Sequence, residues 1–304
     1  MFGTPEKIQT RVFARIPETF EVKGRKSTWV DIQMLGADTP SFIEGPSFDR
    51  DGNLWVTDIP WGRIFKIAPS GTVELVVEYD GEPNGLKFHK DGRAFIADHL
   101  HGIMVLDPKT RKVTPFFDRP LLQRFKGTND LVFASNGDLY FTDQGQTGLH
   151  DPSGRLYRLR TNGQLDCLLD NIPSPNGLVL NLAENVCFVA VTRNNAVWRV
   201  PLMKDGTVSK VGIFIQLSGG SGPDGLALDS EGNLAVCHAG FGVTWLFSPK
   251  GEPLYRLESC TGLATTNCAY GGSGGSTLYI TESKSGTVLA ADLKVAGRPM
   301  YSHA

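Results

Sequence analysis

The sequence predicts an all-β fold, a six-bladed β-propeller with four strands in each blade. The first observation behind this prediction is a set of acidic or amide residues that recur at intervals of 40 to 48 residues. Each of them precedes a short apolar run that is typical of a strand. A repeat of about 40–50 residues with several strands in each unit is typical of a propeller. The six positions are Glu44, Asn84, Asn129, Asn176, Asp224 and Asn267.

The second observation is the regular placement of turn residues. In four units a turn dipeptide follows the repeated position by seven residues, at Asp51-Gly52, Asp91-Gly92, Asn136-Gly137 and Glu231-Gly232. Glycine after an acid or amide favours the tight turn of a β-hairpin. The third unit then divides into four expected strands, at residues 130–133, 139–142, 155–159 and 165–169.

The two ends of the chain are expected to meet in the last blade. The sixth unit begins near Thr265 and has no apolar run for a fourth strand after Leu293. The segment Thr10–Ile16, ahead of the first full unit, can supply that strand. Such pairing closes the ring and removes exposed sheet edges. We therefore expect residues 1–304 to form a single propeller domain, with a strand at about 10–16 completing the last blade.

Composition narrows the classes of partner and compartment. The formal charge is −2, and Lys and Arg form no stripe, so we expect neither nucleic acid nor an acidic membrane as a partner. No apolar run approaches the roughly 20 residues that span a bilayer. The five cysteines are odd in number and show no CxxC pair, which favours free thiols in a reducing compartment. We expect a cytoplasmic protein, either a monomer or a small homo-oligomer.

Equivalent positions in successive blades converge on the propeller axis, so the six repeated residues are expected to surround one point. Glu44 and Asp224 would bring two negative charges there, and Asn129 and Asn176 two neutral carbonyl oxygens. Hard divalent cations prefer such an all-oxygen set, with open positions left for water or substrate. Each dipeptide taken alone is also a common turn signal, but a turn does not require an acid at Glu44.

The loops after each second strand are expected at the same rim as the six residues, because the second strand runs back towards that rim. These loops and the remaining repeated positions supply candidate substrate-binding residues. The candidates are Asn84, Asn267, Trp61, His99, His101, Gln144, His150 and His238.

Several segments resemble one known family. They are IEGPSFDRDGNLWVTD, EPNGLKFHKDGRAFIADH, GTNDLVFASNGDLYFTD, PSPNGLVL and GPDGLALDSEGNLAV, which together cover most of the chain. They resemble the SMP-30/gluconolactonase/LRE-like family, which includes senescence marker protein 30, sugar lactonases, the staphylococcal lactonase Drp35 and diisopropylfluorophosphatase. The resemblance implies a six-bladed propeller with a divalent ion at the inner end of its channel. By motif position it implies Glu44, Asn129, Asn176 and Asp224 as metal ligands, with Asp130 as an acidic neighbour.

The resemblance and the ligand set together predict a lactonase. The metal would polarise the carbonyl of a sugar aldonolactone or related small lactone, and Asp224 would be the base for water. Asp130, Glu44 and a metal-bound hydroxide are alternative bases. Ca²⁺ is the first expectation for the ion, with Zn²⁺, Mg²⁺, Mn²⁺ and Fe²⁺ as alternatives.

One departure leaves the substrate open. The animal sugar lactonase has an arginine two residues before the ND asparagine, where this chain has Gly127. A phosphotriesterase with the same ligands and a non-enzymatic binding platform are the rival functions.

Overall fold

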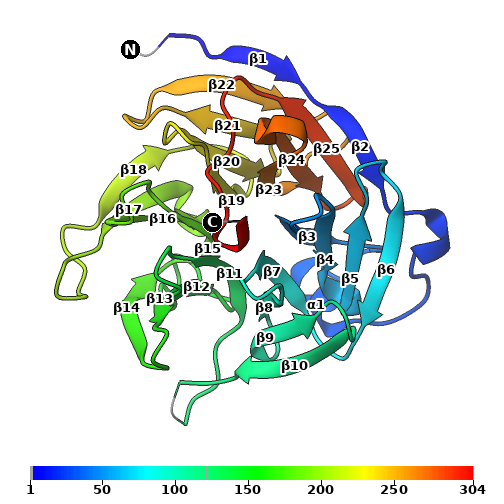
Figure 1. Ribbon diagram of the computed structural model, residues 1–304, viewed down its shortest axis with the longest axis horizontal. Coiled ribbons are helices and arrows are strands. Elements are labelled where there is room, and N and C mark those ends of the chain that lie inside the picture. Colours follow the sequence, from blue (N-terminus) through cyan, green and yellow to red (C-terminus); the bar gives the residue numbers. More distant parts are fainter. Residues whose placement is uncertain (1–2, 121, 304) are drawn as a thin grey trace.

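Six sheets stand around a central axis in the computed structural model, which describes residues 3–120 and 122–303 (Figure 1). The first blade contains β3 (Ile43–Phe48), β4 (Leu54–Asp58), β5 (Arg63–Ile67) and β6 (Val73–Glu78). The second contains β7 (Pro83–Phe88), β8 (Ala94–Asp98), β9 (Gly102–Asp107) and β10 (Lys112–Phe117). The third contains β11 (Thr128–Phe133), β12 (Leu139–Asp143), β13 (Gly154–Leu159) and β14 (Leu165–Ile172).

The second half of the ring repeats this order. The fourth blade contains β15 (Pro175–Leu180), β16 (Val186–Val191), β17 (Ala196–Pro201) and β18 (Gly212–Gln216). The fifth contains β19 (Gly222–Leu228), β20 (Leu234–Ala239), β21 (Val243–Phe247) and β22 (Pro253–Glu258). The last contains β23 (Thr265–Gly271), β24 (Thr277–Glu282) and β25 (Thr287–Asp292). The six-bladed propeller predicted from the repeat is confirmed.

The two chain ends close the ring as predicted. Strand β2 (Arg11–Arg15) pairs antiparallel with β25 and is the fourth strand of the last blade. Its neighbour β1 (Glu6–Gln9) was not anticipated from the sequence; it pairs parallel with β22 and adds a fifth strand to the fifth blade. One N-terminal segment therefore covers the outer edges of two adjacent blades.

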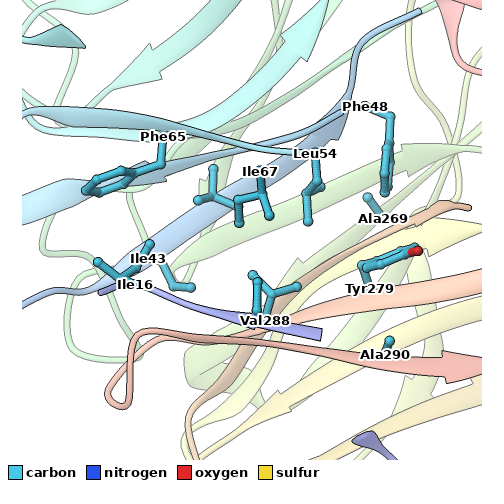
Figure 2. Packing of buried hydrophobic residues seen from close by; sticks show 12 residues of the cluster. Ile16, Ile43, Phe48, Leu54, Phe65, Ile67, Ala269, Tyr279, Val288 and Ala290 are labelled. Carbon is cyan, nitrogen blue, oxygen red and sulfur yellow. The ribbon is translucent and has the colours of Figure 1, made fainter. Parts of the chain in front are cut away.

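The core lies between neighbouring blades. Figure 2 shows the seam between the last and first blades, where Phe65 and Leu54 face Val288 and Tyr279 across the gap. Every residue of β4, β8, β12, β16, β20 and β24 is buried, because a second strand is covered on both faces by the adjacent blades. This burial explains the nearly continuous apolar runs of these strands in the sequence.

The glycines of the predicted hairpin turns lie at the rim opposite the repeated residues. Their φ values are positive, which residues with a side chain rarely adopt. The values are 79°, 89°, 90° and 83° at Gly52, Gly92, Gly137 and Gly232. The hairpins therefore lie at the positions that the turn dipeptides predicted.

The C-terminal segment runs towards the axis at this same rim, and the short turn at Tyr301–His303 lies near the centre of the ring (Figure 1). The Tyr301 ring stacks on Phe133 with centroids 5.0 Å apart, and the Ser302 carbonyl accepts a 2.7 Å hydrogen bond from Arg50 Nε. The Arg298 backbone N–H donates to Leu228 at 2.9 Å. The tail thus joins the first, third and fifth blades and covers one end of the channel.

Short helices lie in loops between strands and near the ends of the chain. Helix α1 (Thr28–Gln33) lies between β2 and β3, and its N-cap Ser27 accepts a hydrogen bond from the Val30 N–H. Single 3₁₀ turns are η1 (Glu18–Phe20), η2 (Ile59–Trp61), η3 (Thr192–Asn194), η4 (Ser273–Gly275) and η5 (Tyr301–His303). Within the described ranges, the helices are too short to cross a membrane.

Candidate metal centre and active site

A bulge in each innermost strand lies at or beside the repeated residue. The pairing register of β3 shifts between Glu44 and Ser47, and the registers of the other five innermost strands shift at the equivalent place. A bulge bends the strand and redirects a side chain. The repeated dipeptides therefore lie inside strands, and their glycines do not form hairpin turns.

Close packing around the axis explains why glycine follows four of the six repeated residues. A methyl group on Gly45 would lie 2.2 Å from the Asn84 carbonyl oxygen, and one on Gly177 would lie 2.5 Å from that of Asp224. Gly85 and Gly225 are equally tight against the next blade. The glycines let the inner strands approach closely, and so hold the repeated residues near one another.

Side-chain hydroxyls tie the inner strands together at the same level. Thr57 Oγ1 donates to the Asn84 carbonyl at 2.7 Å, and Thr142 Oγ1 to the Asn176 carbonyl at 2.7 Å. Thr192 Oγ1 makes the equivalent bond to the Pro223 carbonyl at 2.8 Å. Each bond leads from one blade to the inner strand of the next, so neighbouring blades position each other's candidate ligands.

The two candidate amide ligands are oriented by hydrogen bonds from their nitrogens. Asn129 Nδ2 donates to Gln144 Oε1 at 2.8 Å, and Asn176 Nδ2 donates to Thr192 Oγ1 at 3.2 Å. Within the described chain no donor reaches Oδ1 of either residue. Both amide oxygens remain available to a cation, which is the arrangement that the predicted ligand set requires.

Carboxylates at this level repel one another. Burial raises the pKa of Glu44 to about 7, with a smaller contribution from Asp130. Burial also raises the pKa of Asp224, and the charges of Glu44 and Asp130 raise it further. A bound cation would relieve this repulsion, so the charge of the site fits a metal centre.

The same geometry shows that carboxylates alone do not make the site. Within residues 3–120 and 122–303 no three His, Cys, Asp or Glu side chains are placed to hold an ion by themselves. A cation at the axis therefore needs the amide oxygens of Asn129 and Asn176 as well as the carboxylates of Glu44 and Asp224.

An open cavity of about 760 Å³ lies at the rim of the repeated residues, and its lining includes Glu44, Asn84, Asn129, Asn176 and Asp224. The loop after each second strand also contributes, as the strand directions predicted. These loops supply Ile59, His99, Gln144, Arg193, Gly240 and Lys284. The repeated residues and the loops therefore belong to one mouth.

Buried acids at the ends of the second strands fix these loops. Asp58 Oδ1 accepts the Phe42 N–H at 2.7 Å, and Asp143 Oδ1 accepts the Gly127 N–H at 2.8 Å. Glu282 Oε1 accepts the Ala264 N–H at 2.8 Å. Each acid joins its loop to the segment that enters the innermost strand, so the mouth is built on hydrogen-bonded backbone.

The predicted catalytic acids differ in position. Asp224 is partly exposed to the cavity, whereas Asp130 is 2% exposed and lies within the wall. Asp130 Oδ1 accepts the Leu131 N–H at 2.8 Å, and Oδ2 accepts a 3.4 Å hydrogen bond from Asn267 Nδ2. Asp130 and Asn267 thus form a pair behind the surface of the cavity.

Of the loop candidates, His99 and Gln144 line the main cavity. The His99 ring covers Gly127: a methyl group added there would lie 2.3 Å from it. Burial lowers the pKa of His99, which favours the neutral imidazole.

The other loop candidates lie elsewhere. Trp61 packs with Trp29 and donates to the Thr39 carbonyl at 3.0 Å. A ring nitrogen of His101 lies 2.8 Å from the Asp80 carbonyl, and the His238 ring stacks on Phe241 at 4.7 Å. His150 lines a second cavity beside the first.

Helix α1 supplies mouth residues that the repeat pattern did not reveal. Trp29 and Gln33 of the helix, and Met34 directly after it, line the cavity although they precede the first blade. The available sequence signal was Ser27 followed by an amphipathic turn, which is an N-cap pattern. Arg193 and Lys284 also line the cavity; both belong to loops that the sequence placed at this rim.

Comparisons with known proteins agree with this architecture. The family described as the SMP-30/gluconolactonase/LRE-like region matches residues 42–284. Lactonase Drp35 of Staphylococcus aureus strain MW2 is 31% identical over 243 residues, covering 75% of this chain and 72% of the relative. Lactonase Drp35 of Staphylococcus epidermidis strain ATCC 12228 is 31% identical over 242 residues, with the same coverage.

Solved structures share the fold at lower identity. A calcium-binding protein, regucalcin, from Agrobacterium tumefaciens has a TM-score of 0.78 at 22% identity, over 99% of each chain. A gluconolactonase from Xanthomonas campestris has a TM-score of 0.73 at 21% identity, over 85% of this chain and 86% of that one. The family match and the level of identity to the Drp35 proteins show that the chain belongs to the SMP-30/gluconolactonase/LRE-like family.

Proposed function

We propose that the chain is a metal-dependent lactonase that opens a small cyclic ester. The observation that carries this proposal is the set of oxygens from Glu44, Asn129, Asn176 and Asp224 at the floor of an open cavity. Its family, and relatives named lactonase, support the same reaction class. We propose a sugar aldonolactone or a related lactone as substrate.

The four residues would hold one divalent cation, for which Ca²⁺ is the first choice because all the ligands are oxygens. When bound, such an ion supplies Lewis acidity towards a carbonyl oxygen. Gln144 and Thr192 orient the two amides through the bonds described above. These contacts fix which atoms of Asn129 and Asn176 would face the ion.

In the proposed reaction a water oxygen bonds to the lactone carbonyl carbon, and the ring carbon–oxygen bond breaks. Asp224 is the proposed base because it is an acid that borders the cavity, and it takes one proton from the water. The alkoxide leaving group takes that proton back from Asp224. The new carboxylic acid then ionises, so the product is a hydroxycarboxylate with one proton released. Asp130, held by Leu131 and Asn267, acts from within the wall through its charge.

Proton release from lactones tests this proposal, with phosphotriesters run in parallel. Asp224→Asn should reduce lactone kcat by a factor of at least about 100, because a general base contributes typically 10²–10⁴-fold. Asp170→Asn is the matched control, because Asp170 is exposed in β14. Equal lactone activity in both variants would refute the assigned role, and cleavage of phosphotriesters alone would replace the lactonase by a phosphotriesterase.

A further inference from the structure

A second cavity of about 540 Å³ adjoins the main one. Its wall is the loop between β12 and β13, from Gln144 to His150, together with Ser174. Gln33, Gln144 and Arg193 line both cavities. The mouth is therefore one cleft with a side compartment, and these three residues lie at the junction.

Arg193 is an unpaired cation at that junction. It is exposed at the 3₁₀ turn after β16, and within the described residues it makes no ion pair and no side-chain hydrogen bond. A methyl group added to Gly148 would lie 3.6 Å from Arg193 Cγ, so the side chain lies along the wall of the side compartment. Arg193 and Asp224 both line the main cavity, so the guanidinium and the floor border the same space.

The acidic side chains that line the mouth have partners of their own. Glu44 and Asp224 would face the cation of the proposed function. The Glu282 oxygens accept the backbone N–H groups of Ala264 at 2.8 Å and Ser285 at 3.0 Å. Lys284 lines the main cavity but not the side compartment; it is exposed and, like Arg193, has no acidic partner in the part of the chain that the structure describes. Arg193 and Lys284 are therefore cations of the cavity lining that no acid of the described residues pairs.

We propose that the substrate is a lactone with an anionic substituent, a carboxylate or a phosphate, which Arg193 binds at the entrance of the side compartment. This inference rests on the proposed lactonase function. The guanidinium offers a planar fork of donors that matches both anions. Gln33 lies at the same junction and offers an amide group to the remainder of the substituent, whereas the Gln144 amide already bonds Asn129 and Ser174. The ester ring would then lie over the floor of the main cavity.

The test compares three lactones that differ at one carbon: glucono-1,5-lactone and its counterparts with a 6-phosphate or a 6-carboxylate. The readout is the ratio of kcat/KM for each anionic lactone to that for the neutral one. We expect a ratio of at least about ten for one anion at low salt, because hydrogen bonds to charged groups are the strong ones. Added salt should lower the ratio, since exposed charges are screened.

Variants of Arg193 test whether the preference for an anionic lactone depends on this residue. Arg193→Gln should lower the ratio about tenfold, mainly through KM of the anionic lactone, and Arg193→Lys should retain part of it. Arg199→Gln is the matched control, an exposed arginine of the same blade in β17. Any effect of the lost charge on the metal acts on all three lactones and cancels in the ratio.

The kcat/KM ratios separate failure of the anion site from failure of the lactonase function. A ratio near one in the wild type, or one that Arg193→Gln leaves unchanged, overturns this inference while the lactonase function stands. A metal-loaded protein that hydrolyses none of the three lactones overturns both. The better of the two anionic lactones identifies the substituent.

Discussion

Replacing Gly177 by alanine tests whether close packing of the inner strands holds the candidate metal ligands together. A β-carbon at position 177 would lie 2.5 Å from the Asp224 carbonyl oxygen and 2.6 Å from Gly225 Cα. An ordinary van der Waals contact begins near 3.4 Å. The backbones of β15 and β19 would therefore have to separate by about 0.9 Å, because a close-packed interior has no space for the added carbon.

This displacement has two expected costs. Overpacking of a well-packed interior destabilises by about 1–3 kcal/mol. Separation of the strands also strains the 2.8 Å bond from Thr192 to the Pro223 carbonyl, and a typical hydrogen bond contributes about 1 kcal/mol. We expect the free energy of unfolding to fall by about 2–4 kcal/mol in total. Because metal–ligand distances tolerate only about 0.2 Å, divalent-cation affinity should fall at least about tenfold.

Urea denaturation with EDTA present measures the stability, and calorimetric titration of Ca²⁺ measures the affinity. Gly212→Ala is the matched control: Gly212 begins β18, a β-carbon added there would meet no described atom within 4 Å, and its φ is not positive. The control should stay within about 0.5 kcal/mol of wild type. If Gly177→Ala unfolds and binds Ca²⁺ like the control, the packing argument is refuted.

Three further changes test other parts of the structure. Burial raises the pKa of Glu82 to about 7, above its ordinary 4.5, so the contribution of Glu82 to folding stability is present below pH 4.5 and is lost as the pH rises through 7. The Tm of Glu82→Gln should therefore rise relative to that of wild type between pH 5 and 8, and parallel Tm profiles would contradict this. Tyr301→Ala removes the ring that stacks on Phe133 and should lower the free energy of unfolding in urea by about 2 kcal/mol, while Tyr301→Phe keeps the ring and should not. Thr142→Val leaves the Asn176 carbonyl without its 2.7 Å donor and should lower the free energy of unfolding by about 1–3 kcal/mol. An unchanged denaturation midpoint would show that this hydroxyl does not stabilise the fold.

The repeat made the ring predictable from sequence. Six positions at similar spacing, each before an apolar run, identified the innermost strands, and the short sixth unit predicted pairing with residues 10–16. The same logic placed the mouth loops, because strand direction alone decides which loops share a rim. Strand β1 was missed because parallel pairing at an outer edge leaves no periodic signal in four residues.

Individual side chains were harder to place than loops. Trp61 and His238 lie in predicted mouth loops, yet they pack inward against Trp29 and Phe241. A loop sequence does not reveal which way a side chain turns, since that depends on neighbours far along the chain. Helix α1 falls outside the repeat altogether, so the spacing of the blades carried no information about Gln33 at the mouth.

The central claim is that four side chains at the axis bind one divalent cation. Calorimetric titration of Ca²⁺ into EDTA-stripped and desalted protein tests it most directly, with Glu44→Gln and Asn176→Ala beside the Asp170→Asn control. The account predicts one site per chain in wild type and control, and affinity at least about 100-fold weaker in both ring variants, since loss of even an outer-shell partner typically costs 10–100-fold. Equal Ca²⁺ affinity in all four proteins would contradict the claim.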